Sequence, residues 1–169
     1  MEIPKYEKAK IINNFTMSIW VKPSPQLIGQ RFLISLLSDE PPLFNAHSMS
    51  LERTNNNYES WNGICKCDST NGSRSCDIQQ YHQYFADPTD KWTNIIFGQD
   101  NQNAFLFING LKLMIGGRNN SPISFTHGGI IGAVLYGNYG FYIGDLDDIR
   151  IYNRALSTEE ILRLFNQKS

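Results

Sequence analysis

Apolar and polar residues alternate with a period of two along most of the chain. In FTMSIWVKP (15–23) Phe15, Met17, Ile19 and Val21 share one face, which is the pattern of a strand with one side in a core. Similar runs follow at 32–38, 47–53, 78–85, 91–99, 122–127, 130–137 and 141–152. With the hairpin described next, the pattern predicts roughly ten or eleven short antiparallel strands.

One turn and one helix carry specific local signals. In AFLFINGLKLMIG, Asn109-Gly110 separates two apolar runs and suits the positive φ angles of a type I′ hairpin turn. Near the end of the chain, Ser157 and Glu160 have the spacing of a helix capping box and precede an apolar stripe. The sequence therefore predicts an all-β chain, folded as a two-sheet antiparallel sandwich with one short C-terminal helix. Its 169 residues fit a single domain, 1–169.

The stretch 54–75 differs from the rest because it is polar and rich in Asn, Ser and Gly. We interpret it as a polar insertion that projects from the sheet as a loop or an irregular hairpin. All three cysteines lie in or just after it, at Cys65, Cys67 and Cys76. A disulfide from Cys76 to either of the other two is compatible with this spacing, as are three reduced thiols.

The segment FYIGDLDDIRIY (141–152) carries three carboxylates immediately before an apolar run. Strict alternation would place Asp147 on the same side as Ile149 and Ile151, toward the core. A carboxylate there must be hydrogen-bonded, ion-paired or metal-bound, because an unpaired buried charge costs several kcal/mol. Backbone amides, Arg150 or Arg154, and a hard cation such as Ca²⁺ are the candidate partners.

The stretch IGDLDDIRIYNRALSTEEILRLF also resembles the terminal signature of laminin G-like domains of the concanavalin A-like lectin/glucanase superfamily. FTMSIWVKP, KWTNIIFGQD and AFLFINGLKL resemble other strands of that family in the same order. The resemblance implies a jelly-roll sandwich of two curved antiparallel sheets. It also implies that the acidic residue matching Asp147 helps to hold a structural Ca²⁺.

The charge and the motifs of the chain argue against several classes of function. The net charge is -1 and no Lys/Arg run is present, which argues against nucleic acid as a partner. No apolar stretch approaches the roughly 20 residues of a membrane span. Glycosidases need two carboxylates flanking the sugar ring, whereas the glutamates here are scattered and no nucleophile motif occurs. We therefore expect no catalytic residues and no enzyme activity.

Recognition of a glycan or a protein is the remaining class. Aromatic rings and amide side chains suit sugars, and the candidate ligand-binding residues are Tyr58, Trp61, Asn62, Tyr81, Tyr84 and Tyr139. Trp20 and Trp92 fall in regular strands and are expected to be core or sheet-packing residues. An assembly or adhesion module is the alternative, with the polar insertion as its contact surface. In either case we expect an extracellular, cell-surface or virion location.

Overall fold

The computed structural model describes residues 2–3, 14–36, 46–54, 57–68, 75–117, 128–133 and 140–167. For some of these, including 59–68 and 75–83, it describes the backbone alone. The predicted strand at 122–127 lies outside these residues, as does the second half of the one at 130–137. Within the described part, no helix is long and apolar enough to cross a membrane.

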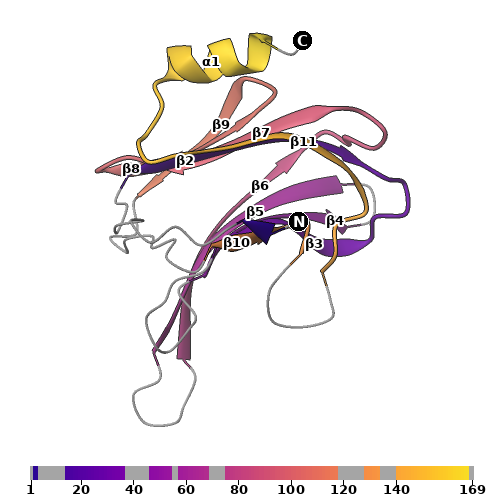
Figure 1. The fold of residues 1–169 in the computed structure, drawn as a ribbon, viewed down its shortest axis with the longest axis horizontal. Coiled ribbons are helices and arrows are strands. Elements are labelled where there is room, and N and C mark those ends of the chain that lie inside the picture. The colour runs from indigo at the N-terminus through magenta and orange to yellow at the C-terminus, as the bar shows by residue number, and fades with distance from the viewer. Residues whose placement is uncertain are drawn as a thin grey trace.

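Two antiparallel sheets face each other, and the predicted sandwich is confirmed (Figure 1). The six-stranded sheet has the spatial order β1 (Glu2–Ile3), β10 (Gly129–Ile131), β3 (Gly29–Leu36), β4 (Ala46–Thr54), β5 (Asn57–Asp68), β6 (Ser75–Phe85). The five-stranded sheet has the order β11 (Gly144–Tyr152), β2 (Phe15–Pro23), β7 (Thr93–Gln99), β8 (Asn103–Ile108), β9 (Leu111–Gly117). The single described helix, α1 (Thr158–Asn166), covers the outer side of the five-stranded sheet (Figure 1).

The central strands of the five-stranded sheet, β2, β7 and β8, are buried on both faces, so the prediction that β2 is half-buried is wrong. Its inner face meets the six-stranded sheet in a core that includes Phe15 and Phe97, with ring centroids 5.9 Å apart. Its other face packs under α1 and the segment before it. The buried Thr16 is satisfied there, because its Oγ1 donates to the carbonyl of Arg154 and accepts from the amide of Leu156, both at 3.0 Å.

The predicted turn is confirmed. Asn109 and Gly110 both have positive φ, at 50° and 75°, between β8 and β9. This is the backbone of a type I′ hairpin, which only Gly and a few short polar residues adopt readily.

The predicted capping box is also confirmed. The Ser157 Oγ accepts the amide of Glu160 at 3.2 Å, and Glu160 Oε2 accepts the amide of Ser157 at 2.9 Å. Arg154 donates two further hydrogen bonds to the same carboxylate, at 2.7 and 2.9 Å. Arg154 first, and then the Ser157 amide, lower the pKa of Glu160 from 4.5 to about 2.

Acid should therefore loosen the start of α1. Because the pKa of Glu160 is depressed by folding, its contribution is present above pH 4.5 and is lost as the pH falls toward 2. We expect the melting temperature of a Glu160→Gln variant to change less than that of the wild type between pH 5 and pH 2. Parallel melting curves measure this, and identical pH profiles would contradict the arrangement.

The stretch predicted as a loop or an irregular hairpin is mostly strand, and it forms part of the regular β5–β6 hairpin. β5 pairs with β4 from Asn57 to Cys65 and with β6 from Tyr58 to Asp68. Figure 1 shows that β5 and β6 run away from the five-stranded sheet toward their connection. Strand positions with no facing sheet do not require apolar residues, so a polar stretch can form a regular strand pair.

The register also discriminates between the two disulfide pairings. Cys67 lies opposite Cys76, whereas Cys65 lies opposite Ile78 and is diagonal to Cys76. A disulfide spans Cα atoms about 4.4–6.8 Å apart, which suits directly opposite residues and not the roughly 7–8 Å of a diagonal pair. After oxidative folding we expect a Cys67–Cys76 link and an alkylatable Cys65, read by non-reducing peptide mapping. A link that includes Cys65 would contradict the register.

Candidate ligand-binding face

The side of the six-stranded sheet that faces away from the five-stranded sheet is here called the outer face. In β4, Met49 and Leu51 belong to the sandwich core, so the alternating positions Ser50 and Glu52 lie on the outer face. β3 contributes Gln30 and Phe32, which lie opposite Glu52 and Ser50 in the register.

A hydrogen bond joins the polar residues of this face. Gln30 Nε2 donates to Ser50 Oγ at 3.0 Å, and Ser50 is 1% exposed. Gln30 itself is exposed and Glu52 is partly exposed. The face therefore offers an oriented amide and a carboxylate beside the ring of Phe32.

The register continues this face across β5 and β6 and divides the predicted residues into two groups. Trp61 lies opposite Ser50, and Tyr84 lies opposite Glu59, which in turn faces Glu52. Trp61 and Tyr84 therefore occupy outer-face positions, and the Tyr84 side chain is 55% exposed.

The other two predicted residues of the hairpin fall in a different row. Asn62 and Tyr81 are in register with Met49, which belongs to the core. For Trp61, Asn62 and Tyr81 these are statements about the backbone, because their side chains lie outside the described part. Tyr139 lies outside the described residues altogether.

Tyr58 is a packing residue, which corrects its assignment as a ligand contact. It is fully buried, with its ring centroid 6.3 Å from that of Phe85. Its hydroxyl is 2.8 Å from Thr89 Oγ1, and the Arg53 guanidinium lies 5.6 Å from its ring centroid. No surface of this ring remains for a ligand.

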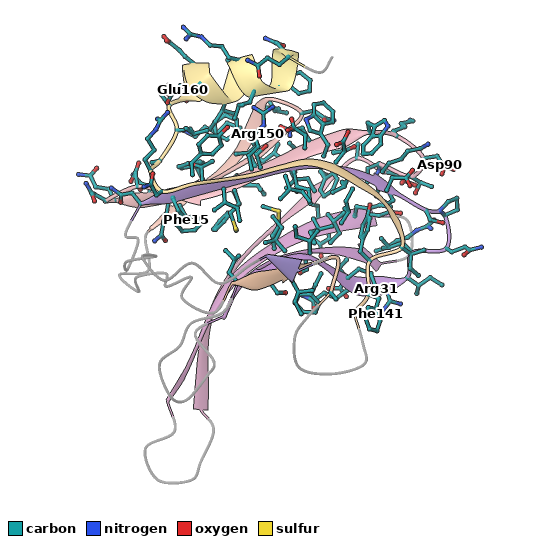
Figure 2. The ribbon with its side chains drawn as sticks, viewed as in Figure 1. Phe15, Arg31, Asp90, Phe141, Arg150 and Glu160 are labelled. Carbon is teal, nitrogen blue, oxygen red and sulfur yellow. The ribbon has the colours of Figure 1, made fainter. Side chains whose placement is uncertain are left out.

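Phe141 adds an exposed aromatic that the sequence did not identify. The Phe32 amide donates to the carbonyl of Gly140 at 2.9 Å, which fixes this segment beside β3. Gly140 rests on the ring of Phe32, so closely that an added Cβ would lie 2.6 Å from it. Phe141 follows, 54% exposed and below the six-stranded sheet near Arg31 (Figure 2).

The sequence contains only a partial signal for this position. Phe141 immediately precedes Tyr142, which packs partly buried against the sandwich core. Alternation would therefore place Phe141 outside. It does not indicate that the exposed ring lies next to β3.

Asp147 does not lean toward the core, which corrects the prediction from alternation. A β-bulge interrupts the pairing of β11 with β2 between Asp147 and Arg150, and Asp148 has a positive φ of 47°. The extra residue lets both Leu146 and Ile149 pack on the core. Asp147 is exposed, and its Oδ1 accepts the amide of Asp148 at 2.7 Å.

The neighbouring acid has a defined partner. Asp148 Oδ1 accepts from Arg150 Nε at 2.7 Å, and this hydrogen bond raises the pKa of the Arg150 guanidinium. Arg154, another candidate partner of Asp147, binds Glu160 instead. Asp148 is thus held in an ion pair with Arg150.

Calcium at Asp147 stays a prediction. Among the described residues, no group of three or more His, Cys, Asp or Glu side chains is placed to share a metal ion. β11 belongs to the five-stranded sheet, so an ion there would lie away from the outer face. Melting curves with and without Ca²⁺ test the prediction, because a bound ion stabilises the fold by mass action.

The two tryptophans predicted to be core or sheet-packing residues differ in burial. Trp20 is confirmed as buried, 7% exposed and stacked on Phe165 of α1 at 5.8 Å between ring centroids. Trp92 is 45% exposed, so it is not a core residue. It lies one residue before β7, at a strand end.

Comparison with known proteins supports the fold. Residues 2–162 match the family model Laminin_G_3, described as the concanavalin A-like lectin/glucanases superfamily. No curated protein sequence matches the chain.

Three solved structures illustrate the similarity. Domain 4 of AbnA, a GH43 extracellular arabinanase from Geobacillus stearothermophilus, in complex with arabinotriose, is 23% identical with a TM-score of 0.60, over 90% of this chain and 66% of that one. A heptameric SAP-like pentraxin from Limulus polyphemus is 12% identical with a TM-score of 0.69, over 97% and 80%. The botulinum neurotoxin serotype D binding domain is 14% identical with a TM-score of 0.68, over 99% and 39%. At these identities the likeness concerns the fold alone.

Proposed function

Because the chain belongs to the concanavalin A-like lectin/glucanase superfamily, we propose that it is a non-catalytic glycan-recognition domain of an extracellular protein. The ligand lies on the outer face of the six-stranded sheet. The observation that carries the proposal is the exposed ring of Tyr84 on the same face as Gln30 and Ser50. A similar domain is known in complex with arabinotriose, which supports the ligand class.

The chemistry of the face suits a sugar. An aromatic ring packs against the apolar C–H face of a pyranose or furanose, while amide and carboxylate groups accept and donate to its hydroxyls. Gln30 is already oriented by its bond to Ser50, so less side-chain entropy is lost when it binds.

Charge favours neutral glycans over acidic ones. Glu52 lies directly opposite Glu59 in the register, so two glutamate positions share a row of the outer face. The described outer-face positions Gln30, Phe32, Ser50, Glu52 and Tyr84 include no Lys or Arg. Sialylated or sulfated glycans would meet like charge there.

A glycan array with the wild type and a Tyr84→Ala variant tests the proposal. We expect at least about a tenfold loss of affinity for neutral oligosaccharides, since removing a stacking ring costs on the order of 1.4 kcal/mol or more. Trp92→Ala is the control, an aromatic residue that is 45% exposed and lies just before β7 of the other sheet. Equal losses in both variants, or no binding by the wild type, would contradict the proposal.

The Glu52–Glu59 pair also favours a second candidate, glycoside hydrolysis. The two residues occupy directly opposite positions in the backbone register, and retaining glycosidases use a pair of carboxyl groups. Release of reducing ends from a polysaccharide panel, abolished by Glu52→Gln, would support hydrolysis. Binding without release supports recognition alone.

A further inference from the structure

The three cysteines of the chain come together at one place in the β5–β6 hairpin. Cys67 lies directly opposite Cys76, and Cys65 is two residues before Cys67 in β5. Alternate residues of a strand share a face, and so do directly opposite residues of paired strands, so all three occupy the same face. For these cysteines the structure describes the backbone alone, so this is a statement about register. The chain contains no other cysteine.

The register also shows which face of the hairpin this is. Trp61 lies opposite Ser50 at an outer-face position, and Cys65 and Cys67 follow it in β5 at intervals of four and six residues. Even intervals along a strand keep the same face. The cysteine positions are therefore on the outer face and not on the side that forms the sandwich core.

The cysteines lie where the hairpin loses its third strand. β4 pairs with β5 as far as Cys65, which lies opposite Ala46. Beyond this point β5 and β6 continue as a pair to Asp68 and Ser75. Two strands alone are only marginally stable in water. A link between β5 and β6 at these positions would therefore stabilise the part of the hairpin that needs it most.

A metal ion can join all three cysteines, whereas a disulfide joins only two. Cys65 and Cys67 have the spacing of alternate strand residues, with Cα atoms about 6.6–6.8 Å apart. The diagonal pair Cys65 and Cys76 is about 7–8 Å apart. Both values are at or beyond the upper limit for a disulfide. A zinc ion lies about 2.3 Å from each thiolate sulfur that binds it, so it bridges a wider gap than an S–S bond.

We propose that Cys65, Cys67 and Cys76, in their reduced form, bind one Zn²⁺ ion on the outer face of the β5–β6 hairpin. Thiolates are preferred zinc ligands, and three of them leave the fourth position of a tetrahedral ion open. His82 does not fill this position, because it lies six residues from Cys76 in β6, roughly 20 Å along the strand. The ion and the predicted Cys67–Cys76 disulfide exclude each other, because the disulfide consumes two of the three thiols.

Cobalt and zinc titrations of the reduced, folded chain without oxygen test the proposal. We expect one Co²⁺ per chain, with a thiolate-to-cobalt charge-transfer absorption that added Zn²⁺ abolishes. Cys65→Ser, Cys67→Ser and Cys76→Ser should each weaken Zn²⁺ binding at least about tenfold, because losing a residue that merely orients a ligand already costs about 10–100-fold. No binding by the wild type, two chains per ion, or unchanged affinity in Cys65→Ser would overturn the proposal.

A variant with a fourth cysteine tests the register directly. Ile78 lies opposite Cys65, so Ile78→Cys adds a thiol at the same face and supplies a fourth zinc ligand. We expect this variant to bind Zn²⁺ at least about tenfold more tightly than the wild type. Gln79→Cys is the matched control, because Gln79 lies opposite Ile64 on the other face. Equal affinity in Ile78→Cys and the wild type, or tighter binding by Gln79→Cys, would reject this placement of the site.

Melting curves connect the ion to the stability of the fold. Zn²⁺ should raise the melting temperature of the reduced wild type by mass action and leave that of the oxidised chain unchanged. Far-UV circular dichroism of each serine variant verifies that it is folded, so that weak binding reports a missing ligand. An equal rise in a variant with all three cysteines replaced by serine would place the ion elsewhere and refute the proposal.

Discussion

Replacing Gly144 with alanine is expected to lower the free energy of unfolding by about 2–4 kcal/mol. Gly144 begins β11 with a φ of 142°, and an added Cβ would lie 2.3 Å from the carbonyl oxygen of Lys22. That oxygen belongs to the backbone of β2, so no side chain can rotate away to relieve the clash. Urea denaturation of the wild type and variant measures the difference.

Gly29→Ala is the matched control for this prediction. Gly29 also has a positive φ, 68°, but an added Cβ would meet nothing within 4 Å. Its cost is the backbone conformation alone, roughly 1 kcal/mol. If both variants lose the same stability, close approach between β11 and β2 is not what requires glycine at position 144.

Truncating Trp20 to alanine is expected to cost about 3–5 kcal/mol. The indole is 7% exposed and stacks on Phe165 with ring planes 11° apart, so it anchors α1 to the sheet. The variant should melt at a lower temperature and lose protection of the α1 amides from hydrogen exchange. Unchanged protection of those amides would show that α1 docks without Trp20.

A double-mutant cycle separates this contact from general packing. Phe165→Ala removes the other ring, and the double variant should lose less than the sum of the single losses. The expected coupling is about 0.5–1.5 kcal/mol for a stacked aromatic pair. Strictly additive losses would mean that the two rings stabilise the fold independently.

These predictions separate two roles for the two sheets. The five-stranded sheet is covered on one side by the six-stranded sheet and on the other by α1, so β2 and β7 are almost entirely buried. The six-stranded sheet carries exposed rings and polar groups on its outer face, with Tyr84 and Phe141 as examples. Stability is therefore expected to depend chiefly on the first sheet, and recognition on the second.

Local chemistry let the sequence determine several features. The hairpin at Asn109-Gly110 and the capping box of Ser157 and Glu160 are both present as predicted. Each depends on residues no more than three positions apart, so their spacing along the chain is enough. Alternation likewise identified the inward face of β2, because Phe15 and Met17, two positions apart, both lie in the sandwich core.

The tertiary structure alone decided which other faces are covered. Thr16 is buried because the segment before α1 returns over β2. Trp92 is exposed at a strand end although its local pattern resembles that of Trp20. A single inserted residue, at the bulge beside Asp148, reverses the face of Asp147. The two-residue period of a strand indicates only which residues share a side. Whether that side is buried depends on which distant segment packs on it.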